Sequence, residues 1–425
     1  MHGDYRSVVL ATSVDAVSLY LPRLADRVLA EMITDHPAVL VTGPRATGKT
    51  TTAQRAATSV IQLADDRQAV AFRADPAVGL TGRPEPILID EWQIVPETLS
   101  AMKPLIDSDP RRGRFIVTGS VRGDLEANTW PGTGRIVRLT MYGLTEREIE
   151  RRTTGPGWLA RLVTGEVVAV SSSVDLQGYV DRALRSGFPE PALNLKAAAR
   201  MRWLTSYVDQ LVTRDSMSIE SGRDPVRLRR YLQAFALNSA GIVDDATLFG
   251  AATISKDTAR AYDFLLQNLL VVEKLPGWAS NRLKRLTLAP KRYLVDAGLF
   301  AGVLGVVADE VLQDGDLLGR VIDTFVAAQI RAELSLMTPA PRLHHLRTSE
   351  GRHEVDLVIE VGARKVIAIE VKATASPKSD DAKHLRWLQT ELGPSLIAAV
   401  VLHTGPETFP LGSGVMACPI SALWS

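Results

Sequence analysis

The sequence predicts an α/β fold: a parallel sheet at the N-terminus, then a helical region, then a small mixed sheet. Three observations lead to this prediction. Short apolar runs near the N-terminus suit strands that are buried on both faces, and they span 38–42, 86–91 and 114–118. Apolar residues recur at three- and four-residue spacing over 175–186 and 197–218, which is typical of helices. Strand patterns then follow at 343–347, 355–360 and 366–371.

Composition favours a globular protein with more than one folding unit. The chain has 425 residues, 46% of them hydrophobic, which exceeds what one core usually organises. Its single cysteine, Cys418, excludes an internal disulfide and favours a reducing compartment, so we expect the cytoplasm. No uncharged apolar run approaches the roughly 20 residues that span a bilayer, so no membrane partner is expected. The net charge of +1 decides nothing about nucleic acid.

A glycine-rich turn follows the first expected strand. A helix is expected over 24–34, and the strand at 38–42 comes after it. Residues 43–50 read GPRATGKT and fit the GxxxxGK[ST] pattern without a mismatch. The strand before the motif and the helix after it are the context that a phosphate-binding loop requires.

Each residue type in this loop has a physical role. Gly43 and Gly48 let the backbone curl so that its N–H groups face a phosphate chain, helped by the dipole of the following helix. Lys49 reaches the outer phosphates, and the Thr50 hydroxyl is placed to ligate Mg²⁺. ATP and Mg²⁺ are therefore the expected cofactors. The expected nucleotide contacts are Gly43, Pro44, Arg45, Ala46, Thr47, Gly48, Lys49, Thr50 and Thr51.

Two acids end the second apolar run. Asp90 and Glu91 follow residues 86–89, and magnesium needs a carboxylate at the end of a neighbouring parallel strand. Asp90 would hold the metal through water, and Glu91 would orient and deprotonate the hydrolytic water. Together with Lys49, the two acids predict ATP hydrolysis in addition to binding.

Small hydroxyls end the third apolar run. Thr118 and Ser120 lie where ATPases of this kind sense the γ-phosphate, so both are candidate nucleotide contacts. The alternative is that they are polar caps on a strand-to-loop turn.

These motifs resemble those of prokaryotic AAA-type ATPases whose C-terminal half is a domain of unassigned function (DUF4143). The resemblance covers nearly the whole chain. The matching segments are GPRATGKTT, ILIDEWQ, FIVTGS, Gly134–Arg135, SGFPEP at 186–191, and Tyr207 with Arg214–Asp215. In such proteins an arginine often completes the site at a subunit contact, which implies a homo-oligomer and points to Arg135 or Arg214. Surface or core ion pairs are the alternative use of these arginines.

The segment 225–294 has the layout of a winged helix. Helices are expected at 228–238, 245–249 and 255–270, with strands at 270–275 and 284–288. The third helix would expose Lys256, Thr258, Arg260 and Tyr262, and the wing offers Arg282, Lys284 and Arg285 to DNA. Alternatively, the unit is a packing or oligomerisation module with Tyr262 and Trp278 in its core.

Carboxylates and a lysine recur on the strands of the C-terminal third. Glu370 and Lys372 lie on one face of a strand, and Asp356 lies on its neighbour. Asp356 and Glu370 could hold a divalent cation, with Lys372 positioning the water. This D…ExK set resembles the PD-(D/E)XK nuclease core, in which Asp323 on the preceding helix would be a further metal ligand. The alternative is an ordinary strand-end ion pair between Glu370 and Lys372.

The sequence thus predicts four regions. They are an AAA-type ATPase domain (1–148), a linker and helical lid (149–224), a winged-helix-like domain (225–300) and a nuclease-like domain (301–425). One hypothesis is an ATP-driven enzyme that binds or cuts DNA. The other is a regulatory ATPase switch that binds a protein partner and uses the C-terminal domain for recognition without cleavage.

Overall fold

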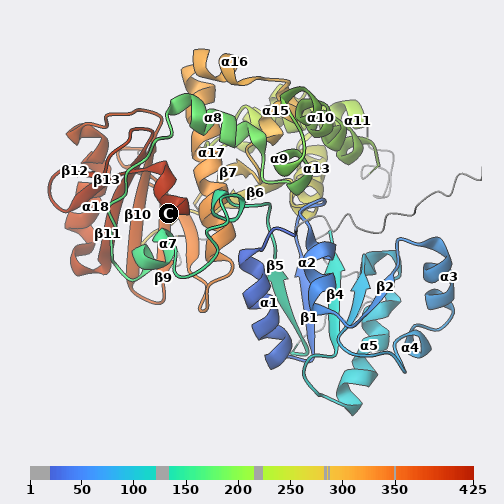
Figure 1. The fold of residues 1–425 in the computed structure, drawn as a ribbon. Helices are drawn as coiled ribbons and strands as arrows, with labels where there is room; N and C mark the ends of the chain where they lie inside the picture. The colour runs from blue at the N-terminus through green and yellow to red at the C-terminus, as the bar shows by residue number, and fades with distance from the viewer. Residues whose placement is uncertain (1–19, 121–133, 215–223, 282–284, 286–287, 349–350) are drawn as a thin grey trace, which may run out of the picture.

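The N-terminal region is a five-stranded parallel sheet with helices around it (Figure 1). The computed structural model describes residues 20–120, 134–214, 224–281, 285, 288–348 and 351–425. The strands follow the order β2-β3-β4-β1-β5. Their bounds are β1 Ala38–Thr42, β2 Ser59–Gln62, β3 Ile87–Asp90, β4 Phe115–Gly119 and β5 Ile136–Thr140. The helices are α1 Leu24–Asp35, α2 Lys49–Ala56, α3 Asp66–Ala74, α4 Pro76–Gly79 and α5 Glu97–Ser108.

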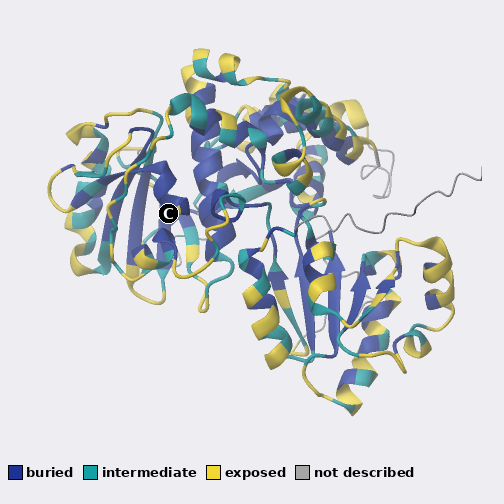
Figure 2. Cartoon of the chain, in the orientation of Figure 1, coloured by how far each residue is buried: buried dark blue, intermediate teal, exposed yellow. Residues whose placement is uncertain are grey.

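Burial on both faces explains why the central strands are continuously apolar. Every residue of β1, β3 and β4 is buried, and two hydrophobic clusters pack against the two faces of the sheet (Figure 2). The parallel registers pair Thr42 with Gly119 and Ile89 with Val117. The segments that follow β1, β3 and β4 therefore meet at one edge of the sheet.

A helical region follows the parallel sheet. Its helices are α6 Glu146–Ile149, α7 Trp158–Val163, α8 Leu176–Arg185, α9 Pro189–Leu193, α10 Ala197–Arg214, α11 Pro225–Ala236, α12 Asp245–Ala251 and α13 Lys256–Asn268. An antiparallel pair, β6 Val272–Leu275 and β7 Lys291–Leu294, comes after α13. The second strand of this pair lies at 291–294, and most of the predicted strand at 284–288 lies outside the described residues. Residues 282–284 and 286–287 of that segment lie outside the described residues.

The C-terminal region is a mixed sheet with the order β12-β13-β11-β10-β9-β8. Its strands are β8 Arg342–Arg347, β9 Glu354–Val361, β10 Lys365–Lys372, β11 Leu396–His403, β12 Phe409–Pro410 and β13 Val415–Pro419. The helices of this region are α15 Leu299–Leu304, α16 Ala308–Gln313, α17 Gly315–Leu334 and α18 Lys383–Leu392. The long α17 stands between the mixed sheet and the helical region (Figure 1). The predicted α/β fold class is confirmed.

One hydrophobic core spans the whole chain after the parallel sheet. A single cluster of buried residues runs from Trp158 through Tyr231 and Phe300 to Trp424. Tyr179 of α8 and Phe325 of α17 each meet the ring of Trp424 edge-on. The helical region and the mixed sheet therefore share their packing.

In the part of the chain that is described, no helix combines the length and apolar character needed to cross a bilayer.

Candidate functional site

The glycine-rich loop joins β1 to α2 at the edge of the sheet where β3 and β4 also end. Two of its residues adopt left-handed backbone, Ala46 at φ 60° and Gly48 at φ 86°. Helix α2 then begins at Lys49, and its first-turn N–H groups lie at the end of the loop. All nine residues expected to contact nucleotide thus lie in the loop or in the first turn of α2. Such a backbone suits a phosphate group.

Lys49 carries a buried positive charge. The residue is only 4% exposed, and its Nζ donates to the Pro44 carbonyl at 2.7 Å. Among the described residues, no carboxylate oxygen lies within ion-pair distance of this ammonium. Burial lowers the pKa of Lys49 to about 8, although the charges of Glu91 and Asp90 act in the opposite direction. An incoming phosphate would supply the opposite charge, so the loop fits the β- and γ-phosphates of ATP.

The side chains of Thr50, in the first turn of α2, and Asp90, at the end of β3, contact each other directly. The Thr50 hydroxyl donates to Asp90 Oδ1 at 2.7 Å, and the Thr118 hydroxyl donates to the same oxygen at 2.5 Å. The Asp90 side chain is buried and lies next to the phosphate loop. A hydroxyl and a carboxylate at this point are the hard oxygen ligands that Mg²⁺ prefers, so the pair fits the metal.

Glu91 is held by three polar groups. Its φ of 57° is left-handed, and its N–H donates to the Thr118 hydroxyl at 3.2 Å. Its carboxylate accepts hydrogen bonds from the Ser120 hydroxyl, at 3.1 Å, and from the Gln93 amide. The structure therefore brings Thr118 and Ser120 to the two acids, as expected of residues near the γ-phosphate. Gln93 was missed because a lone glutamine after a strand carries no signal of its own.

One of the two candidate arginines, Arg135, does not join this group of side chains. Arg135 precedes β5, whose first residue is level with Ala38 at the start of β1, and it donates to Asp107 at 3.0 Å. It therefore lies at the end of the sheet opposite the phosphate loop of its own chain. The side chain of Arg214 lies outside the described residues. Contact with a neighbouring subunit stays a prediction.

An aromatic cluster of α10 reaches the phosphate loop instead. The Tyr207 hydroxyl donates to the Arg45 carbonyl at 3.5 Å, and its ring stacks on Trp203 with centroids 5.3 Å apart. Phe188 packs against the same two rings. The helical region therefore touches the nucleotide loop directly, through a residue that sequence comparison singled out without a role.

A lysine that the sequence did not single out lies between the C-terminal carboxylates. Lys291 of β7 is 1% exposed, and its Nζ lies 2.7 Å from Asp323 Oδ2 and 2.9 Å from Asp356 Oδ1. The Tyr293 hydroxyl donates to the other Asp323 oxygen, and the Val371 N–H donates to the other Asp356 oxygen, both at 2.9 Å. Burial raises the pKa of Asp323 to about 6, against the attraction of Lys291. One ammonium thus bridges the two aspartates and offsets part of their negative charge.

The expected metal set is corrected by this geometry. Lys372 Nζ pairs with Glu370 Oε1 at 2.9 Å, which matches the alternative of a strand-end ion pair. Over the described ranges, no group of three or more His, Cys, Asp and Glu side chains is arranged to hold a metal ion. Asp323, Asp356 and Glu370 therefore form no three-carboxylate metal group among the described residues, and the Lys291 ammonium lies between the first two.

Glu370 gives the C-terminal cluster a pH dependence. Burial, with repulsion from Asp356, raises the pKa of Glu370 to about 8, so the folded chain binds more protons than the unfolded chain between about pH 4.5 and 8. The free energy of unfolding should fall as pH rises through this window, by roughly 1–3 kcal/mol. Urea unfolding at pH 5 to 8 should show a flatter profile for Glu370→Gln. Glu354→Gln, at a half-buried position of β9, serves as control, and an unchanged slope in Glu370→Gln would contradict the assignment.

The candidate DNA-contacting residues are partly used for packing. Lys256 and Arg260 are exposed on α13 and Thr258 is half-buried, but Tyr262 is 1% exposed and packs against Tyr231. Arg285 pairs with the buried Glu360 of β9 at 3.0 Å and stacks over Trp278. The prediction that Tyr262 and Arg285 are free to meet DNA is therefore wrong. Arg282 and Lys284 lie outside the described residues.

Comparisons with known proteins match three separate stretches of the chain to protein families. Residues 35–150 match the family described as an AAA domain, 176–310 a domain of unknown function (DUF8612), and 318–423 a domain of unknown function (DUF4143). The uncharacterised proteins Rv2008c of Mycobacterium tuberculosis and Mb2031c of Mycobacterium bovis are each 28% identical over 387 residues, covering 90% of this chain and 80% of theirs.

A solved structure adds a weaker likeness. The Walker-type ATPase PABY2304 of Pyrococcus abyssi is 16% identical, with a TM-score of 0.43 over 68% of this chain and 97% of its own. The family matches and the parallel sheet lead to one conclusion: the chain carries a domain that matches the AAA domain family over residues 35–150, joined to a C-terminal domain that matches the DUF4143 family over 318–423.

Proposed function

We propose that the chain binds ATP with Mg²⁺ at the phosphate loop and hydrolyses it. The observation that carries the proposal is the convergence of Lys49, Thr50, Asp90 and Glu91 at one edge of the parallel sheet. The buried ammonium of Lys49, whose hydrogen bond goes to a backbone carbonyl, is suited to exchange that contact for phosphate oxygens.

The residues divide the work of hydrolysis between them. Lys49 and the loop N–H groups bind and orient the phosphates, and Thr50 and Asp90 hold the metal, which supplies charge neutralisation on the phosphate oxygens. Glu91 orients the attacking water and accepts its proton. The hydroxyls of Thr118 and Ser120 keep the two acids in place, since each donates to one of them.

We further propose that ATP turnover is coupled to nucleic acid. This part rests on α13, which carries Lys256 and Arg260 exposed on its surface, and these side chains are suited to phosphate contacts. The second candidate is a regulatory switch whose C-terminal domain recognises a protein partner without cleavage. The Lys291 ion pairs favour this candidate over nucleic-acid cleavage, because one oxygen of each aspartate is already engaged by the ammonium.

One experiment tests both parts. ATP hydrolysis is measured for the wild-type chain and for Glu91→Gln, each with and without single-stranded, double-stranded and branched DNA. Glu91→Gln should bind ATP with little change and lose about 10²- to 10⁴-fold in turnover, because it removes the general base. DNA should raise turnover of the wild type.

Each outcome has a separate meaning. Equal turnover in Glu91→Gln and wild type would remove the proposed mechanism of hydrolysis. Turnover that DNA leaves unchanged would reject coupling to nucleic acid and favour the switch.

A further inference from the structure

Three consecutive charged residues of α6 are buried, and each pairs with a different part of the chain. Glu146, Arg147 and Glu148 are exposed by only 2%, 6% and 2%. Together they are called the α6 junction below. A four-residue helix with three buried charges is costly unless each charge is paired. The partners of these three charges therefore show which parts of the chain the α6 junction connects.

Two of the three charges connect to the C-terminal side. The Glu146 carboxylate accepts from Arg182 and Arg185 of α8, both at 2.5 Å. Arg147 pairs with Glu333 near the end of α17 at 3.2 Å. The junction is thus fixed to two helices of the region that shares the large hydrophobic core.

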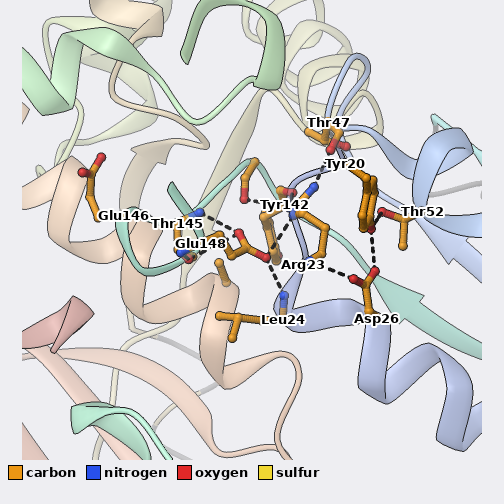
Figure 3. Close-up of polar contacts among 12 residues, drawn as sticks. Tyr20, Arg23, Leu24, Asp26, Thr47, Thr52, Tyr142, Thr145, Glu146 and Glu148 are labelled. Atoms are coloured by element: carbon orange, nitrogen blue, oxygen red, sulfur yellow. Dashed lines mark hydrogen bonds and ion pairs between the residues drawn. The ribbon is translucent and has the colours of Figure 1, made fainter. Parts of the chain in front are cut away.

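The third charge connects to the N-terminal side. Glu148 Oε1 accepts from Arg23 Nε at 2.9 Å and from the Leu24 N–H at 2.7 Å, which is the first N–H of α1. Its other oxygen accepts from the Thr145 N–H at 2.8 Å. Figure 3 shows Glu148 between Thr145 on one side and Arg23 with Leu24 on the other.

Arg23 extends this connection to the phosphate loop. Its guanidinium is 7% exposed and, besides Glu148, donates to the Thr47 carbonyl at 2.8 Å and to the Tyr142 carbonyl at 2.9 Å (Figure 3). Thr47 lies between the two left-handed residues of the loop, Ala46 and Gly48. One planar side chain therefore holds the loop backbone at the point where it turns toward α2.

We propose that Arg23 is a positioning residue for the phosphate loop, and that Arg23 and Glu148 link the loop's conformation to the α6 junction and through it to α8 and α17. This inference rests on the proposed function, since a loop is positioned for a nucleotide. A change in the loop on nucleotide binding is then transmitted to the C-terminal region through the Arg23–Glu148 pair.

The test combines a measurement without nucleotide and one with it. Hydrogen–deuterium exchange of peptides covering 43–51 and 142–150 is compared among wild type, Arg23→Lys, Arg23→Gln and Arg27→Gln. Arg27 is the matched control, because it lies on α1, the helix that Arg23 precedes, and its side chain is 83% exposed. Both Arg23 variants should exchange faster in the two peptides, and Arg27→Gln should match wild type.

The nucleotide measurement separates positioning from a general loss of stability. Arg23→Lys should fold, because it keeps the positive charge opposite Glu148. It cannot donate to Thr47 and Tyr142 at once, so the loop loses part of its support. The KM for ATP, and the Kd by calorimetry, should rise about tenfold with kcat nearly unchanged, as for a loss of uniform binding. ATP should also slow exchange in the 142–150 peptide of wild type but not of Arg23→Lys.

The outcomes are distinguishable from failure of the proposed function. A wild-type chain that binds no ATP would reject that function, while the nucleotide-free exchange comparison would still decide whether Arg23 orders the loop. Exchange in Arg23→Lys that equals wild type over 43–51 would overturn the inference. A lower kcat at unchanged KM and Kd would do so as well.

Discussion

Replacing Lys49 with alanine is expected to abolish ATP hydrolysis, with a loss of at least about 10²- to 10³-fold in kcat/KM. The reason is that Lys49 supplies the buried positive charge at the loop, and its Nζ needs only to leave the Pro44 carbonyl to meet a phosphate. The measurement is steady-state phosphate release, together with nucleotide binding by calorimetry. Undiminished turnover would contradict the central proposal.

Loss of activity in this variant should not come from unfolding. Burial lowers the pKa of Lys49 to about 8, so below that pH the folded state bears the cost of a desolvated charge. Without nucleotide at pH 7, Lys49→Met should therefore be at least as stable as wild type, and the difference should vanish above about pH 10.5, where the lysine is neutral in both states. A clearly less stable Lys49→Met would contradict this account.

The largest stability change is expected at Lys291. Lys291→Ala leaves the buried Asp323 and the half-buried Asp356 without their shared cation, and breaking a buried pair typically costs about 3–5 kcal/mol. The free energy of unfolding by urea or guanidinium measures this loss. Lys372→Ala is the matched control, because Lys372 pairs with Glu370 on its own strand, β10, but has a side chain that is 32% exposed. Its effect should be smaller.

The pH dependence of this loss gives a second check. In Lys291→Ala the two aspartates repel each other, so protonating one of them should recover part of the stability at pH 5 relative to pH 8. Equal losses of stability in Lys291→Ala and Lys372→Ala, or a loss that does not change with pH, would contradict this account. The ion pairs of Lys291 would then stabilise the fold no more than the pair between Lys372 and Glu370.

The sequence was sufficient for the elements that carry a local pattern. β1 begins and ends where it was predicted, and β8, β9 and β10 lie within one residue of their predicted bounds, since strand burial is visible as an apolar run. The phosphate loop followed from glycines and a lysine at fixed spacing. The two acids after β3 followed because parallel strands end at one edge.

The sequence was insufficient where partners are far apart in the chain. Lys291 meets Asp323 and Asp356 across 32 and 65 positions, and Arg23 meets Glu148 across 125. A single lysine or arginine has no periodicity, so neither pattern nor propensity distinguishes it from a surface charge. For the same reason the sequence did not show that Lys291 lies between two of the expected metal ligands, Asp323 and Asp356.

The hydrophobic core that runs from Trp158 to Trp424 is not divided where the family matches divide the chain. One family match ends at residue 310 and the next begins at residue 318, so two separate families each match one part of this stretch. The packing has no such division, because rings from α8 and α17 meet Trp424 at the C-terminus. The hydrophobic core therefore crosses the boundary between the two family matches. Substitutions on the two sides of that boundary must remain compatible with each other.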